Sequence, residues 1–152
     1  MLKGVECIYL KGILEVHVKK KGRIVEHWVD NNLVVDYPRT SIANALYSGA
    51  TIKPITSIGI GTGQNLPTGS DTGLTGAYIK PVQNKTKPTP TSIQISFSIL
   101  DTEANGMKIS EFGLFDQDGK LFARKVRQDN GVVKIIDKTQ DISIDGIWTI
   151  YI

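Results

Sequence analysis

The chain has 152 residues, a length that suits one compact domain with its own core, so we treat residues 1–152 as a single domain. The net charge of +3 is too small to predict a nucleic-acid partner, and the single cysteine, Cys7, excludes an intramolecular disulfide. No stretch approaches the roughly 20 apolar residues that cross a bilayer, and charged residues interrupt the N-terminus where a signal peptide would be apolar. We therefore expect no membrane partner and synthesis in a cytoplasm.

Residues 13–30 are predicted to form a β-hairpin. Residues 13–19 alternate between aliphatic and polar side chains, which is typical of a half-buried strand. A second β-rich run follows Gly22, a residue that can supply the positive φ of a tight turn. Lys19, Lys20 and Arg23 gather at the tip, where we expect them to be solvated or to contact a partner protein.

Residues 38–48 are predicted to form the one short helix of the chain. Starting from Ile42, apolar residues recur at a spacing of three and four, which places them on one helical face. Pro38 suits the first helical position, and Gly49 suits the left-handed residue that ends a helix. A helix this short needs a partner, so we expect it against a face or an open end of a sheet.

The rest of the chain favours strands. Clear alternation in 92–99, an Asp-Gly turn inside 107–126 and an apolar final segment 141–152 predict strands there, and shorter strands are expected at 55–60 and 78–82. With about eight short strands at regular spacing, the fold class is predicted to be mainly β, an antiparallel β-sandwich with one short α-helix.

Three finer expectations concern single segments of this β-rich part. The two prolines of the polar linker 83–91 argue against a central strand. Asp145 and Gly146 are expected to mark a bulge in the last strand, and Trp148 is expected in the core.

Residues 57–74, "SIGIGTGQNLPTGSDTGL", superficially suggest a phosphate-binding turn. No helix can follow the glycines and no Gly-Lys-Ser or Gly-Lys-Thr is present, so a nucleotide site is not expected. Instead, Gly59 and Gly61 are interpreted as points where another part of the chain packs closely, with Gly63 beginning a long loop. Leu66 and Leu74 are the large apolar residues of that loop and are expected to pin it down.

The two histidines and nearby carboxylates are candidate metal ligands. His17 and His27 lie on the predicted hairpin near Glu15 and Glu26, and two imidazoles with a carboxylate suit a transition metal. Whether the histidines share a face depends on the length of the turn, and no third ligand is fixed by spacing. We therefore predict ordinary strand histidines, no metal and no cofactor. No catalytic constellation is evident either, so an enzyme is not expected.

Several segments in order resemble a known family. They are "NNLVVDYPRTSIANALYSG", "ITSIGIGTG", "LPTGSDTGL", "EANGMKISEFGLFDQDGKLFARK" and "IWTIYI". The set is similar to small virion structural proteins of tailed bacteriophages, which are associated with the tail, baseplate, fibre or neck and collar. The resemblance covers residues 31–152, and residues 1–30 fall outside it as a possible attachment element.

This resemblance implies a non-enzymatic structural component, assembled in the host cytoplasm and located in the virion, where it packs with its own copies or with other virion proteins. The two long loops and the basic hairpin tip are the expected contact regions. The residues predicted to contact partners are Gln64, Asn65, Leu66, Pro67, Leu74, Lys19, Lys20 and Arg23. The alternative is a carbohydrate-binding module of a phage fibre, for which Trp28 is the candidate exposed aromatic platform.

Overall fold

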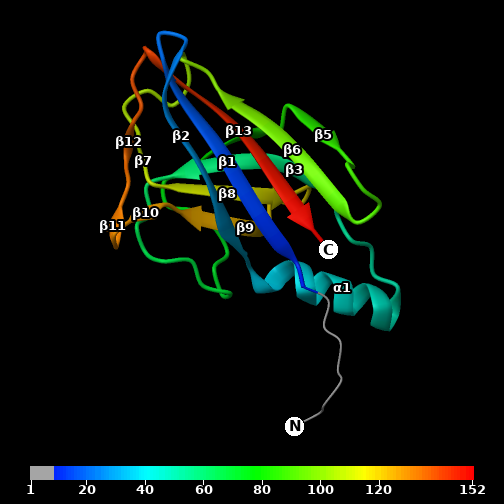
Figure 1. Ribbon diagram of the computed structural model, residues 1–152. Coiled ribbons are helices and arrows are strands. Elements are labelled where there is room, and N and C mark those ends of the chain that lie inside the picture. The colour runs from blue at the N-terminus through cyan, green and yellow to red at the C-terminus, as the bar shows by residue number, and fades with distance from the viewer. Residues whose placement is uncertain (1–8) are drawn as a thin grey trace.

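The structure is a computed structural model of the protein, in which residues 9–152 are described (Figure 1). Cys7 and the rest of residues 1–8, the start of the predicted attachment element, lie outside the described residues. The elements in chain order are β1 (Lys11–Lys20), β2 (Arg23–Val34), α1 (Asp36–Ser48), β3 (Ile55–Gly61), β4 (Tyr78–Pro81), β5 (Asn84–Thr86), β6 (Ser92–Ile99), β7 (Lys108–Ile109), β8 (Glu111–Asp116), β9 (Leu121–Val126), β10 (Gln128–Asp129), β11 (Val132–Val133), β12 (Ile136–Asp137) and β13 (Ile142–Tyr151).

One antiparallel sheet of nine strands forms the body of the protein, in the order β4-β3-β8-β9-β2-β1-β13-β6-β5. The sheet curls so that β3, β8 and β9 cross behind β1, β13 and β6, giving two layers (Figure 1). The long strand β2 belongs to both layers, because it pairs with β1 as far as Asn32 and then with β9 at Leu33 and Val34. The predicted mainly β class and sandwich shape are confirmed, with a single curled sheet supplying both layers.

Alternation along the strands explains the core between these layers. In β1 every second residue is buried, as its sequence pattern predicts. In β6 the same alternation holds over residues 95–99, whereas Ser92 is buried and Ile93 only partly buried at the start of the strand. Trp148 of β13 is fully buried, which confirms its predicted place in the core, and its indole Nε1 donates a hydrogen bond to Asn32 Oδ1 at 2.7 Å. Buried residues facing one another across the layers include Leu14, Val16, Phe97, Ile99, Ile58, Ile60, Phe112 and Leu114.

Helix α1 lies at one end of the curled sheet (Figure 1). It begins at Asp36, two residues before the predicted start, so Pro38 is its third residue and is buried. Gly49 ends the helix with φ 74°, and its N–H donates to the Ala45 carbonyl at 2.9 Å, as predicted for a left-handed cap. The predicted apolar face is only partly covered, because Ile42 packs on the core while Leu46 is exposed.

One sequence-based expectation needs correction. Asp145 and Gly146 form no bulge, since β13 pairs without interruption with both β1 and β6. Gly146 instead leaves space for the ring of Phe97. The linker 83–91 contains the short strand β5, which pairs with β6 at the edge of the sheet, so the expectation that its prolines exclude a central strand is confirmed. Among residues 9–152, no helix has the length and apolar character needed to cross a membrane.

Candidate functional site

The loop 62–77, which carries most of the predicted contact residues, is held by the carboxylate of Glu111 in β8. Glu111 is 0% exposed. Its Oε1 accepts hydrogen bonds from the backbone N–H of Gly63 at 2.9 Å and of Thr75 at 2.7 Å. These two residues stand near the two ends of the loop, so a single carboxylate closes it.

Arg124 of β9 extends this anchor to the middle of the loop. Its Nε donates to Glu111 Oε2 at 2.8 Å, and a second guanidinium nitrogen donates to Asp71 Oδ2 at 2.9 Å. Asp71 in turn accepts a hydrogen bond from the backbone N–H of Thr68 at 2.9 Å. Arg124 is almost fully buried, so both ion pairs are shielded from solvent.

Glycines of the segment 57–74 make room for Glu111 and for the side chains packed beside it. A Cβ at Gly61 would stand 2.4 Å from Glu111 Oε1, and one at Gly59 would stand 2.6 Å from the ring of Phe115. The interpretation of close packing is therefore confirmed. The N–H of Gly63, which a phosphate would need, is occupied by the protein's own carboxylate.

The predicted contact residues of this loop separate into two groups. Leu74 is pinned against Gly59 and Gly113, as expected. Leu66 is 60% exposed, so the expectation that it pins the loop is wrong. Gln64 and Asn65 are exposed beside it. Leu66 and Pro67 line an open groove of about 410 Å³, whose other lining residues are Asp30, Asn31, Asn32, Leu33, Arg124, Lys125, Val126 and Gln128.

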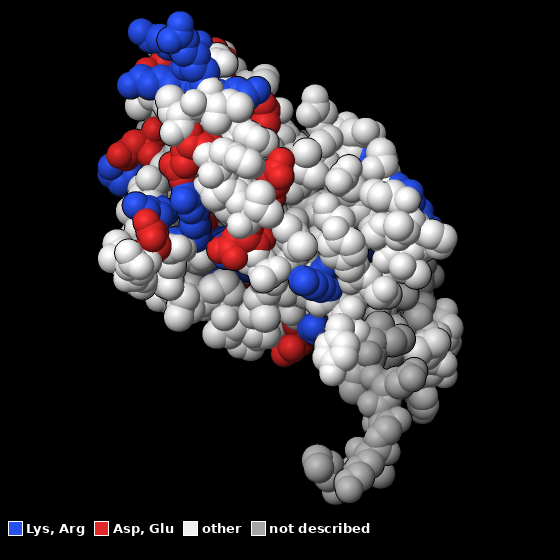
Figure 2. Space-filling model, viewed as in Figure 1, with Lys and Arg blue, Asp and Glu red and all other residues white. Residues whose placement is uncertain are grey.

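The basic tip of the β1–β2 hairpin is exposed but partly neutralised. Lys and Arg side chains gather there in Figure 2, at the top of the view. Lys19 Nζ lies 2.5 Å from Asp145 Oδ2, while the more distant pair Lys20–Asp141 is separated by 3.9 Å. Burial tends to raise the pKa of Asp145, but hydrogen bonds from Lys19 and Ser98 outweigh it and hold that pKa below its ordinary value.

Glu103, which lies in the loop between β6 and β7, fastens that loop to the sheet. Its carboxylate accepts hydrogen bonds from Lys80 Nζ at 2.7 Å and from the Tyr78 hydroxyl at 2.5 Å. Both donors belong to the edge strand β4. The carboxylate therefore fastens the loop after β6 to this edge of the sheet.

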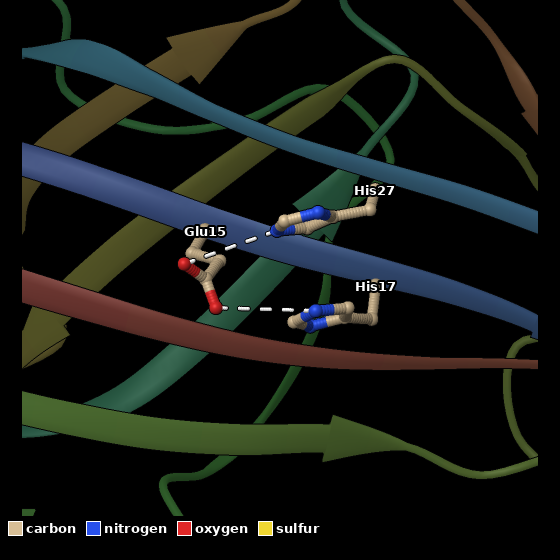
Figure 3. A group of neighbouring side chains, drawn as sticks. All are labelled: Glu15, His17 and His27. Carbon is tan, nitrogen blue, oxygen red and sulfur yellow. Dashed lines mark ion pairs between the residues drawn. The ribbon is translucent and has the colours of Figure 1, made fainter. Parts of the chain in front are cut away.

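The sequence could not decide whether the two histidines share a face, and in the structure they do. His17 of β1 stands directly opposite His27 of β2, with the rings stacked at a centroid distance of 4.2 Å and an interplanar angle of 1°. Glu15 lies two residues before His17 on the same face, and each of its oxygens is 3.9 Å from one histidine Nε2 (Figure 3). One ligand atom from each residue lies within 4.8 Å of the others.

A β-bulge produces this juxtaposition. The turn consists of Lys21 and Gly22, and the pairing next to it sets Lys19 opposite Ile24. A regular ladder would continue with His17 opposite Glu26, leaving His27 on the other face. The register shifts between Val18 and Lys19, so His17 pairs with His27 instead. The sequence alone gave no sign of this shift.

Trp28, the proposed platform for a sugar, is only 8% exposed. Its ring packs edge-on against Phe112 at a centroid distance of 5.9 Å, and the guanidinium of Arg127 covers it at 5.1 Å. The expectation that Trp28 is exposed is therefore wrong.

A search of protein-family models, curated proteins and solved structures finds no match to this chain.

Acid is expected to loosen loop 62–77 through Asp71. Burial tends to raise the pKa of Asp71, but hydrogen bonds from Thr68 and Arg124 outweigh it and hold the pKa below the ordinary value of 3.8. Ionised Asp71 therefore stabilises the fold above about pH 4, and this contribution is lost as the pH falls through the lower folded-state pKa. Urea unfolding at pH 6 and at pH 3 measures the loss.

Asp71→Asn is the comparison for this prediction. Asp30, Glu103 and Asp145 also have lowered pKa values and remain in both proteins, so the difference between wild type and variant reports Asp71. The variant is expected to be less stable at pH 6 and to lose less on acidification. An equal loss in both proteins would show that Asp71 does not contribute.

Proposed function

We propose that this protein is a non-enzymatic structural component of a tailed-phage virion, an adaptor or assembly element that works in contact with other copies of itself. The proposal starts from the ordered set of segments that resembles such proteins. In support, three of those segments converge on one buried network: the first contributes Gly63, the second Asp71, and the third both Glu111 and Arg124. The resembling segments therefore act together as one structural unit.

The observation that carries the proposal is the apolar surface at the α1 end of the molecule. Leu46 is 82% exposed and Tyr47 93% exposed, and Ile52 and Ile152 are also exposed. Charged residues gather on the opposite side, around the hairpin tip, and far fewer lie around α1 (Figure 2). Monomeric soluble proteins seldom expose a large apolar patch, and such patches mark contact sites.

An apolar cavity adjoins this surface. It has a volume of about 360 Å³ and lies between α1 and the end of the sheet. Residues lining it include Pro38, Ile42, Ile52, Ile55, Phe122 and Ile150. A large side chain from a second copy of the chain, such as Leu46 or Tyr47, would find apolar partners in this cavity.

Mass photometry and light scattering of the full chain test the proposal. We expect the wild type to self-associate and the double variant Leu46→Asp/Tyr47→Asp to be monomeric. Both side chains are largely exposed, so little packing is lost, and two aspartates in the last turn of α1 should lower the free energy of unfolding by about 1–2 kcal/mol through helix propensity and the helix dipole.

Val132→Asp is the control, because it places one such charge, where the double variant places two, at another exposed apolar residue, on the short hairpin β10–β11. It is expected to associate like the wild type. A wild-type chain that is strictly monomeric and binds no tail or neck protein would overturn the proposal. A specific hit on a glycan array would favour the alternative, a carbohydrate-binding module, although Trp28 is buried.

A further inference from the structure

We infer that Glu15, His17 and His27 form a binding site for a divalent transition-metal ion of the zinc class, on the outer face of the β1–β2 hairpin. The inference is independent of the proposed virion role. It rests on the geometry in Figure 3, where both imidazole rings turn their nitrogens toward the carboxylate.

The distances suit an ion better than direct bonds between the side chains. At 3.9 Å, the contacts from the Glu15 oxygens to the two Nε2 atoms are too long for hydrogen bonds. Donor atoms around a tetrahedral zinc ion, with bonds of about 2.1 Å, stand about 3.4 Å apart. The Glu15 oxygens and the Nε2 atoms therefore need to approach by about 0.5 Å, and any ligand pair at the 4.8 Å limit by about 1.4 Å. The parallel rings must also tilt toward the ion, and all three side chains are partly solvent-exposed.

The donor types select the class of metal. Two imidazole nitrogens and one carboxylate oxygen suit zinc and its neighbours, whereas calcium and magnesium prefer sets made of oxygen alone. Zinc has no geometric preference from its d electrons, so it tolerates a site built on a regular sheet face. The fourth position faces solvent and is open to water or to a donor from another molecule.

The surroundings limit the site to these three residues. Asp145 lies opposite His17 on β13, but its carboxylate is bonded to Lys19 and Ser98. Glu26 pairs with Val18, whose side chain faces the core, so it lies on the other face of the hairpin. An ion bound to Glu15, His17 and His27 would join β1 to β2 beside the bulge and fix the register that creates the site.

Isothermal titration with ZnCl₂ tests this inference on the full chain without a histidine tag. We expect one ion per chain. At a zinc concentration of 100 times Kd, the melting temperature should rise by about 5–10 °C, the shift expected for a domain of this size. Titration with Co²⁺ should give the visible absorption of a site with mixed nitrogen and oxygen ligands.

Substitutions separate this site from adventitious binding. Loss of an outer-shell partner typically weakens metal binding about 10- to 100-fold. His17→Asn and His27→Asn each remove a direct ligand, so each should weaken zinc binding by more than this. Glu15→Gln should weaken it at least about tenfold. Glu26→Gln is the matched control and should bind as wild type, and Cys7→Ser should do the same. Binding that survives in the His17→Asn/His27→Asn double variant, or no binding at millimolar zinc, would overturn the inference.

Discussion

Glu111→Gln is expected to lower the free energy of unfolding by about 3–5 kcal/mol, because it leaves Arg124 buried without its main counter-charge. The amide also presents N–H groups where two backbone N–H donors and a guanidinium now converge on two oxygens. Thermal unfolding should show a fall in melting temperature of about 6–20 °C for a chain of this length.

The control for this substitution is Asp137→Asn. Asp137 also forms an ion pair, with Lys108 at 2.6 Å, but both side chains are exposed. Its loss should cost at most about 1 kcal/mol. Hydrogen exchange adds a local test, because the amides of Gly63 and Thr75 should lose protection in Glu111→Gln and keep it in Asp137→Asn. A Glu111→Gln protein as stable as wild type would show that the buried network is not needed.

An apolar replacement of the Glu111–Arg124 pair should fail for a further reason. Buried ion pairs can often be exchanged for packed hydrophobic residues without loss. Here the carboxylate also accepts the N–H groups of Gly63 and Thr75, and a leucine would leave both of them without an acceptor. The carboxylate is thus required by the backbone of the loop as well as by the arginine.

Local sequence patterns predicted the elements that depend on near neighbours. Alternation predicted the buried face of β1 and of residues 95–99 in β6, and Asp-Gly located the turn between β8 and β9. Gly49 marked the end of the helix. Each of these signals acts over a few residues, so one sequence is enough to detect it.

Contacts between distant residues could not be predicted in this way. Glu111 lies 48 residues from Gly63 and 36 from Thr75, and in sequence it is one more polar residue beside a strand. The bulge beside Val18 was equally hidden, although it decides whether His17 and His27 share a face. The network around Glu111 and the cluster of Glu15, His17 and His27 both depend on strand pairings that only the folded sheet provides.

The buried network around Glu111 gives the motifs a structural role. Gly61, Glu111 and Arg124 lie in the segments on which the proposed virion role rests, and all three are buried and in contact with one another or with the same loop. Their role is to hold the fold. The residues that select this protein's partners should therefore be exposed ones, such as Leu46 and Tyr47 on α1, rather than the residues of the motifs.

Gly146→Ala is expected to destabilise the protein by about 3 kcal/mol, at the upper end of the usual cost of overpacking a core. A Cβ there would stand 2.0 Å from Cζ and 2.3 Å from Cε1 of Phe97. Gly146 pairs with Val16 on one side and Phe97 on the other, so its backbone is held by two strands. Phe97 is buried and in contact with the ring of Phe112, so it cannot move aside freely.

Two further variants isolate this steric cause, with urea unfolding as the measurement. Gly73→Ala is the control, because a Cβ at Gly73 meets nothing within 4 Å, and it should be neutral or slightly stabilising. Phe97→Leu removes the ring atoms that the new methyl group would strike, so the double variant Gly146→Ala/Phe97→Leu should be more stable than Gly146→Ala alone. If the double variant is no more stable than Gly146→Ala, the cost of Gly146→Ala does not arise from a clash with the ring. The packing of β13 against β6 would then not depend on the absence of a side chain at Gly146.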